Sequence, residues 1–168
     1  MCLIDDYLAH CRKYEKEFGV KTAVFIEVGA FMEIYGLDLE DQQVGQIREI
    51  TKILNIALTR KTKYEPHSKK NPMMAGVTSP AFYKYAKMLL SHGYTVIEIR
   101  QVTPPPNPKR EVTEIHSPGV SLSTAYIDKS NFLFVVYAEE IPSKTNKNGL
   151  FLGVTKIDVT TGESWVSE

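Results

Sequence analysis

The order of its periodic segments constrains the fold of this chain more than any other feature. Up to about residue 120, helical spacings of apolar residues are interspersed with short runs of the kind that form strands. Beyond residue 120, strand patterns follow one another without a helical pattern between them. This order predicts an α/β domain with a mixed β-sheet and surrounding helices over residues 1–120. Residues 121–168 would then begin a second domain, seen here as a partial β-hairpin.

Three segments of the first part have the pattern of amphipathic helices. They cover residues 3–18, 39–54 and 79–92. Gly19 and Gly93 follow the first and third of these, where glycine commonly ends a helix. Ser79 and Pro80 are the expected N-cap and first helical residue of the third.

Short apolar and β-branched runs predict the strands. They cover residues 22–28, 31–35, 56–59, 72–77, 94–102 and 111–116, and in the second part residues 132–137 and 150–159. Gly29-Ala30 would turn the chain between the first two strands. Residues 104–108 are rich in proline, which cannot pair in a central strand, and predict an exposed connector.

Composition narrows the class of protein. The chain has 168 residues, of which 43% are hydrophobic and 24% charged, as in soluble globular proteins. Its 20 basic and 20 acidic residues cancel, so nucleic-acid binding would require a local basic patch. Cys2 and Cys11 form no disulfide framework, which favours an intracellular, reducing compartment. No membrane span or targeting signal is evident. Two or three strands cannot bury both faces of a sheet, so we expect the chain to be part of a larger protein.

Phe31 and Glu33 directly follow the predicted Gly29-Ala30 turn. At alternate positions of a strand, both side chains leave the same face. An exposed Phe can enter a base stack at a cost of roughly a few kcal/mol, and this cost falls where a pair is mismatched or a base is extra. The neighbouring carboxylate would be repelled by phosphates but would accept a hydrogen bond from a displaced base. Alternatively, Phe31 belongs to the core and Glu33 is a surface carboxylate.

The predicted loop over residues 60–71 carries an excess of positive charge opposed only by Glu65. Its cations are Arg60, Lys61, Lys63, Lys69 and Lys70. Such a loop can follow DNA phosphates and release counterions, although lysine clusters are also common on solvated loops. Tyr64 and His67 would add packing or hydrogen bonds to sugar and phosphate.

A small metal-dependent nuclease is a less favoured alternative. It would pair carboxylates around a metal ion, with Lys61 or Lys63 as the base. The acidic candidates are Glu27, Glu33, Asp38, Glu40 and Asp41. The chain has no phosphate-binding loop and no recognisable nucleophile, and its four histidines share no ligand spacing. We therefore expect no catalytic residue, metal ion or cofactor in this segment.

Six motifs, in order, resemble the N-terminal part of the MutS family of DNA mismatch-repair proteins. They are EVGAFMEIYG at residues 27–36, IALTRK at 56–61, PMMAGV at 72–77, GYTV with Gln101 at 93–101, EVTEIHSPG at 111–119, and LGV with DVTTGE at 152–163. The first is similar to the family's strand-glycine-aspartate-Phe-x-Glu signature. Ala30 and Met32 depart from it, replacing an acidic and an aromatic residue, and Ile99-Arg100-Gln101 departs from the usual Cys-Glu-Gln.

The resemblance implies a mismatch-recognition domain followed by the start of a connector domain. Phe31 would be the wedge entering from the minor groove, Glu33 would contact the base, and the basic loop would lie near the DNA backbone. The partner would be double-stranded DNA with mismatches or small loops. The parent protein would be a dimer that binds ATP and Mg²⁺ far downstream, while this segment would be non-enzymatic. The alternative is a module of the same fold for branched DNA or protein contacts, with Phe31 buried.

Overall fold

The computed structural model describes residues 3–40, 42–118, 132–141, 149–158 and 162–167. The chain divides into two compact units, Met1–Val120 and Ser121–Glu168. The predicted domain boundary after residue 120 lies outside the described residues. Among the helices of the described ranges, none has the length and apolar character needed to cross a membrane.

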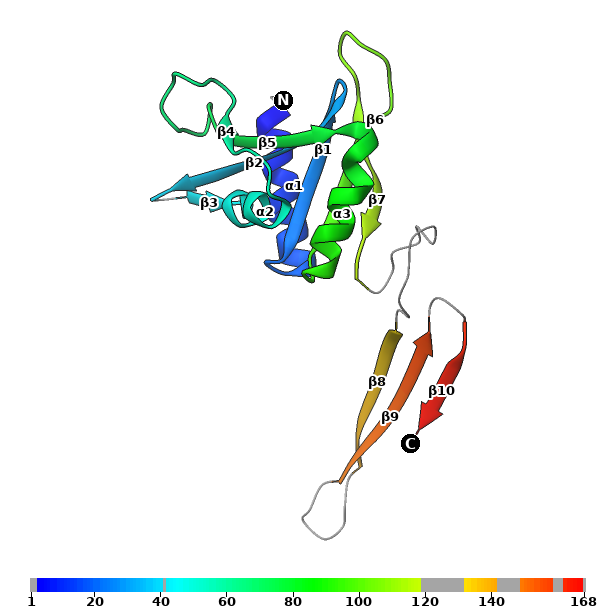
Figure 1. The fold of residues 1–168 in the computed structure, drawn as a ribbon. Coiled ribbons are helices and arrows are strands. Elements are labelled where there is room, and N and C mark those ends of the chain that lie inside the picture. The colour runs from blue at the N-terminus through cyan, green and yellow to red at the C-terminus, as the bar shows by residue number, and fades with distance from the viewer. Residues whose placement is uncertain (1–2, 41, 119–131, 142–148, 159–161, 168) are drawn as a thin grey trace. The chain divides into compact units, whose positions relative to one another are not determined.

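The first unit is a mixed β-sheet with helices on both faces (Figure 1). Its elements are α1 (Leu3–Phe18), β1 (Thr22–Val28), β2 (Phe31–Leu39), β3 (Gln42–Val44), α2 (Ile47–Leu54), β4 (Thr59–Arg60), β5 (Met73–Thr78), a 3₁₀ turn (Ser79–Ala81), α3 (Phe82–Ser91), β6 (Thr95–Gln101) and β7 (Arg110–His116). The strand order is β4-β5-β2-β1-β6-β7, with β3 paired to β2. Only the β1–β6 pair is parallel among the described pairs of this sheet, so the predicted mixed sheet with surrounding helices is confirmed.

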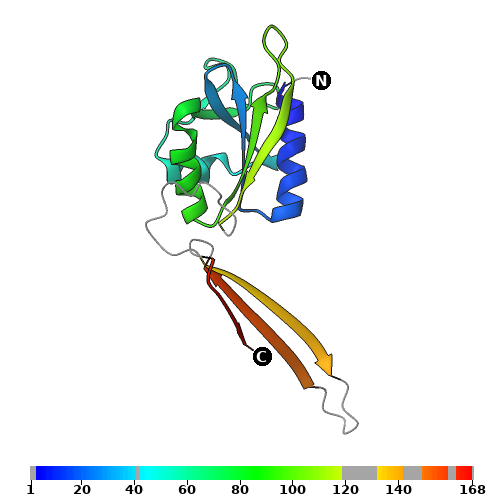
Figure 2. The same ribbon diagram turned by 90° about the vertical axis from the view of Figure 1, so that its right-hand side faces the viewer.

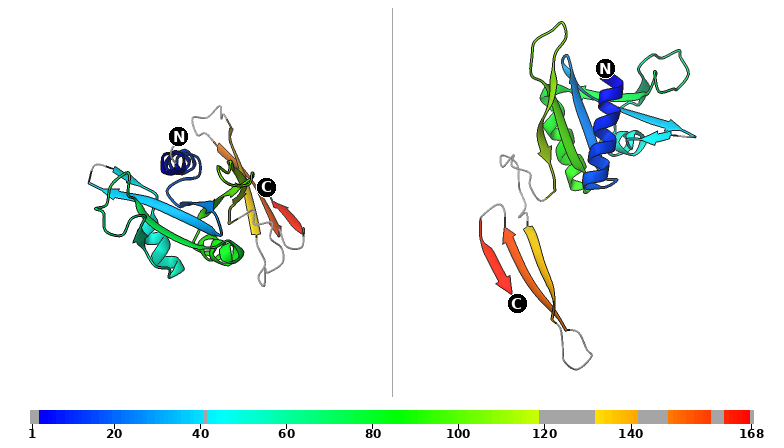
Figure 3. Two further views of the ribbon diagram at one scale, coloured as in Figure 1. Left: turned by 90° about the horizontal axis from the view of Figure 1, so that it is seen from above. Right: turned by 180° about the vertical axis from the view of Figure 1, so that it is seen from behind.

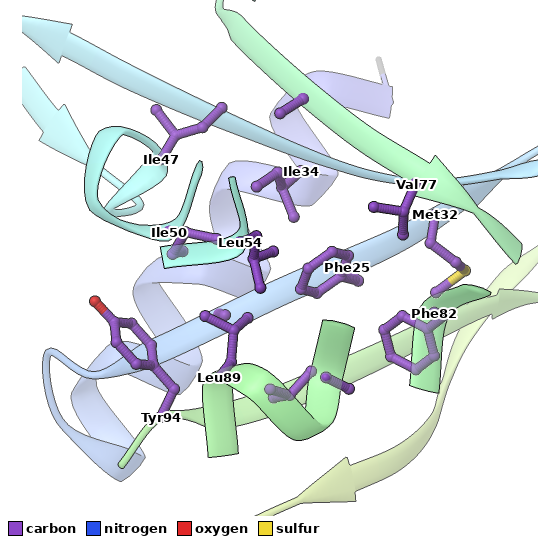
Figure 4. Packing of buried hydrophobic residues seen from close by; sticks show 14 residues of the cluster. Phe25, Met32, Ile34, Ile47, Ile50, Leu54, Val77, Phe82, Leu89 and Tyr94 are labelled. Carbon is purple, nitrogen blue, oxygen red and sulfur yellow. The ribbon is translucent and has the colours of Figure 1, made fainter. Parts of the chain in front are cut away.

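The helices divide the core into two clusters. The view from above shows α1 on one face of the sheet, with α2 and α3 on the other (Figure 3). On the α1 face, Tyr7 and Leu8 pack with Tyr35 of β2. On the opposite face, Met32 lies close to Val77 and Phe82 (Figure 4). Consecutive residues of β2, such as Ile34 and Tyr35, therefore belong to different clusters, because successive side chains of a strand point to opposite faces.

The predicted helix over residues 39–54 is wrong in its first half. Only Ile47–Leu54 is helical, while β2 extends to Leu39 and forms a hairpin with β3. Leu39 and Val44, the first two apolar residues of the predicted pattern, lie on the two strands of this hairpin, where Leu39 pairs with Gln42 and Val44 pairs with Leu37. Gly45, with φ of 69°, then turns the chain into α2.

Two shorter predictions also need correction. The strand expected over residues 56–59 is limited to Thr59–Arg60, because Asn55 ends α2 in a left-handed conformation and coil follows. Ser79 does not cap α3, which begins at Phe82 after the 3₁₀ turn. The Ser79 hydroxyl instead donates to Oε1 of Glu27 at 3.4 Å.

The second unit is a three-stranded antiparallel sheet in the order β10-β9-β8. Its strands are β8 (Phe132–Ile141), β9 (Gly149–Asp158) and β10 (Ser164–Ser167). The hairpin of β8 and β9 was predicted, and its last predicted residue, Val159, lies outside the described residues. The four-residue β10 was not predicted. Several large apolar side chains on these strands are exposed, because one small sheet cannot cover both of its own faces.

Candidate nucleic-acid interface

The two sequence-predicted DNA contacts lie at the end of the first unit where α1 begins. Figures 1 and 2 show the β1–β2 turn and the loop after β4 at this end. The loop also touches the first turn of α1, where Lys69 Nζ lies 3.4 Å from Asp5 Oδ1. Along the sheet, however, the two are separated: Phe31 pairs with Thr78 at one end of β5, and the loop joins β5 at Met73.

Phe31 is 49% exposed although β2 is an interior strand of the sheet. It is the first residue after the turn, where Gly29 has φ of 61°, a conformation that glycine adopts readily. Its backbone pairs with Val28 and Thr78, so its position is set by two strands. The arrangement offers an aromatic ring to solvent on a rigid hairpin.

Glu33 shares the face of Phe31 and is half-buried. Its carboxylate Oε2 accepts a hydrogen bond from the hydroxyl of Tyr35, the next residue on the same face. On the neighbouring strand it faces Gly76, whose lack of a side chain leaves space beside it. Tyr35 was not singled out from the sequence, although its two-residue spacing from Glu33 is a signal that would have found it.

The basic loop is organised around Asn71, which is only 1% exposed. The Asn71 side chain accepts from the Thr62 amide at 2.7 Å and donates to the carbonyls of Thr62 and Glu65 at 2.9 and 3.0 Å. His67 Nε2 accepts from the amide of Asp38 at 3.1 Å. The predicted loop is therefore held by hydrogen bonds within itself and by one to β2. The sequence did not indicate this role of Asn71, because a single asparagine in a polar segment carries no signal of burial.

The five cations of this loop are exposed. They are Arg60, Lys61, Lys63, Lys69 and Lys70. Arg60 Nη2 donates to the Lys63 carbonyl at 2.9 Å. Tyr64, at 92% exposure, stands among them with its ring 5.9 Å from the Lys63 ammonium. Cations and an aromatic ring projecting from an ordered loop can contact a phosphate backbone.

A polar network supports the sheet behind the hairpin. Glu27, next to the turn, accepts from Arg100 Nη1 at 3.2 Å and from the Gln101 amide at 2.9 Å. Arg100 also bonds the buried Glu98, whose second oxygen lies 2.8 Å from Nε2 of His116. Burial raises the pKa of Glu98, but the hydrogen bonds from His116 and Arg100 outweigh it and hold the pKa below its ordinary value.

The four nuclease candidates that the structure describes, Glu27, Glu33, Asp38 and Glu40, do not converge on a metal site. Among the described residues, the group close enough to hold a metal ion consists of Glu98, Glu114 and His116, none of them a nuclease candidate. In this group the Glu98 oxygens are already engaged by His116 and Arg100. Asp38 pairs instead with Arg48, and Asp41 lies outside the described residues.

Comparison with known proteins places these features in a family context. The family model described as MutS domain I matches residues 13–125. A protein named as a DNA mismatch repair mutS homolog, from Acanthamoeba polyphaga mimivirus, is 31% identical over 96% of this chain and 14% of its own length. The DNA mismatch repair protein MutS of Methanosarcina barkeri is 32% identical over 92% of this chain and 17% of its own length. The corresponding values for the MutS protein of Thermotoga maritima are 28%, 99% and 18%. The chain thus spans less than a fifth of the length of these relatives.

Proposed function

Because the chain belongs to the MutS family and contains its domain I, we propose that it recognises mismatched DNA through Phe31 and Glu33. Phe31 inserts as a wedge from the minor groove, and Glu33 contacts the base that is displaced. The observation that carries the proposal is the exposure of Phe31, 49%, at the tip of a paired hairpin, with Glu33 on the same face.

The wedge reads how easily the DNA deforms. Opening a base step costs roughly a few kcal/mol, and less where a pair is mismatched or a base is extra. Stacking an aromatic ring on a base returns about 1–3 kcal/mol. Insertion of Phe31 is therefore close to balance on an intact duplex and favourable at a mismatch or small loop.

Glu33 increases the difference in affinity between mismatched and matched DNA. Its negative charge is repelled by the phosphates, which weakens binding to an intact duplex. At a mismatch the displaced base offers an N–H donor, and a charge-assisted hydrogen bond offsets this repulsion. The carboxylate thus contributes to discrimination more than to affinity.

The basic loop supplies attraction that is independent of sequence. The chain has a formal net charge of +0, so Arg60 and the neighbouring lysines would provide the local field that faces the DNA backbone. Without contributions from the rest of a MutS protein, we expect affinity near the nonspecific range, about 10⁻⁴ to 10⁻⁶ M. In the whole protein we propose dimerisation and downstream binding of ATP and Mg²⁺, with no catalytic residue or cofactor in this segment.

A module of the same fold for branched DNA or protein contacts is the second candidate. It predicted a buried Phe31, and the exposed ring favours the wedge instead. The two candidates differ in whether a single mismatch changes affinity.

The test is binding to a duplex with one G·T mismatch and to its matched twin, at one fixed salt concentration. We expect the full chain to prefer the mismatched duplex, and Phe31→Ala to lower that preference about 5-fold or more, the change that corresponds to one stacked base. Glu33→Ala is expected to lower the same preference. Phe18→Ala is the matched control, because Phe18 is also a partly exposed phenylalanine, at 40%, but is the last residue of α1, whereas the candidate interface lies where α1 begins.

Circular dichroism establishes that each variant is folded. Equal binding of the two duplexes by the unaltered chain, or an unchanged preference in Phe31→Ala, would overturn the proposal. Equal binding combined with tighter binding to a branched duplex would favour the second candidate.

A further inference from the structure

We propose that Tyr35 is a positioning residue for Glu33 and fixes which oxygen of its carboxylate is presented to a displaced base. The inference rests on the proposed function and extends it to a residue outside the Phe-x-Glu pair. Phe31, Glu33 and Tyr35 occupy successive positions on one face of β2. Along this face, exposure falls from the exposed Phe31 through the half-buried Glu33 to the buried Tyr35.

The hydroxyl of Tyr35 donates to Oε2 of Glu33. With Oε2 engaged, Oε1 is the acceptor left for a base. A carboxylate held at one oxygen loses rotational freedom before DNA binds, so less conformational entropy remains to be lost in the complex. The hydrogen bond therefore presets both the orientation of Glu33 and the oxygen that accepts.

The ring of Tyr35 is fixed by its packing. Tyr35 is 3% exposed, and Tyr7 of α1 packs edge-on against it with ring centroids 5.2 Å apart. Tyr7 is itself held, because its hydroxyl donates to the Val24 carbonyl at 2.8 Å. The chain of contacts from β1 through α1 to Tyr35 leaves the hydroxyl little freedom to move away from Glu33.

Gly76 of β5 provides the space that Glu33 occupies. A methyl group at Gly76 would lie 3.3 Å from Cγ of Glu33 and 3.1 Å from the Met32 carbonyl oxygen. Any side chain there would press on Glu33 from the side away from β1. Glu33 is thus placed by a donor along its own strand and by an open position on the neighbouring strand.

Tyr35 also remains a donor at ordinary pH. Burial raises the pKa of its hydroxyl well above the usual value, and the neighbouring Glu33 carboxylate raises it further, while Arg110 opposes the shift. The hydroxyl therefore keeps its proton, which it can share with the carboxylate oxygen. A phenylalanine at this position would keep the packing and remove only this donor.

Tyr35→Phe tests the inference in the same G·T and matched duplex assay. We expect the preference for the mismatch to fall about 3- to 10-fold, the range of a net hydrogen bond, with little change in affinity for the matched duplex. Tyr94→Phe is the matched control, because it removes a hydroxyl that donates to Gln46 at 2.9 Å, away from this face.

A double-mutant cycle separates positioning from a general structural effect. If Tyr35 acts through Glu33, Tyr35→Phe will change the preference in the unaltered chain but not in a Glu33→Ala background. A decrease of equal size in both backgrounds would assign Tyr35 a merely structural role and overturn the inference. An unchanged preference in Tyr35→Phe would overturn it as well.

The outcome is distinguishable from failure of the proposed function. If Phe31→Ala and Glu33→Ala abolish the preference but Tyr35→Phe retains it, only the role of Tyr35 is wrong. If the unaltered chain shows no preference, the proposed function fails first, and this inference fails with it.

Discussion

At the scale of single residues, the site depends on the alternation of β2. Phe31 and Glu33 lie on the α1 face of the sheet, where Phe31 is exposed and Glu33 half-buried, while Met32 between them is 0% exposed and packs with Val77 and Phe82 on the other face (Figure 4). Met32 departs from the aromatic residue that the family signature suggests, and its flexible side chain fills the space between these neighbours. One residue thus anchors the strand that presents the other two.

This alternation predicts opposite effects for adjacent substitutions. Met32→Ala removes buried atoms and should lower the free energy of unfolding by about 2–5 kcal/mol. Phe31→Ala removes a half-exposed ring and should lower it by less than about 1 kcal/mol. Urea unfolding of the two variants measures both values. A larger decrease in Phe31→Ala than in Met32→Ala would mean that Phe31 serves the core.

At the scale of elements, the sequence predicts best where one local signal dominates. The limits of α1 and β1 agree with the prediction, because amphipathic spacing and a terminal glycine define α1 and a β-branched run defines β1. The segment before α2 was misread, because the hairpin of β2 and β3 spaces its apolar residues like a helix. Non-local pairing decides such cases, and local spacing does not contain it.

The candidate site shows the same limit. The positions of Phe31 and Glu33 on one face followed from strand periodicity, and the structure places them so. The ordered conformation of the basic loop could not be predicted from the sequence. It depends on the burial of Asn71 and on its hydrogen bonds to nearby loop residues, and neither produces a periodic pattern. The ion pair of Arg100 with Glu27 depends on the pairing of β1 with β6, which the sequence does not specify.

The β6–β7 pair provides a prediction about pH. Glu98 has a pKa below its ordinary value in the folded chain, so its contribution to stability is present above the unfolded pKa and is lost as pH falls through the folded one. We expect the urea concentration at which half of the unaltered chain is unfolded to decrease once the pH is lowered past about 4.5, near the ordinary pKa of glutamate. Glu98→Gln should be less stable at pH 7 and should show a smaller change between pH 3 and 5. Equal pH dependence in both proteins would show that the Glu98 contacts with His116 and Arg100 contribute little.

At the scale of the whole molecule, the distribution of charge matters more for DNA binding than the net charge does. The chain is neutral in sum, but its basic loop carries five cations at the end of the first unit where α1 begins, and the acidic residues near them are Glu65 in the loop and Asp5 beside Lys69. A backbone contact supplied by this loop would be the same on matched and mismatched DNA, because phosphates carry no information about pairing. Affinity and discrimination should therefore be separable, with the loop serving the first and the hairpin serving the second.

Salt dependence measures this separation. Removing one cation that neutralises a phosphate should reduce the slope of log K against log salt by about 0.9, so Lys61→Gln combined with Lys63→Gln should reduce it by up to about 1.8. The ratio of mismatched to matched affinity should stay constant, since the substitutions weaken binding to both duplexes equally. Lys16→Gln is the matched control, because Lys16 is exposed in the last turn of α1, away from the loop. A changed ratio with an unchanged slope would place these lysines at the displaced base, whereas no change in either would remove the loop from the interface and leave Phe31 and Glu33 to bind without it.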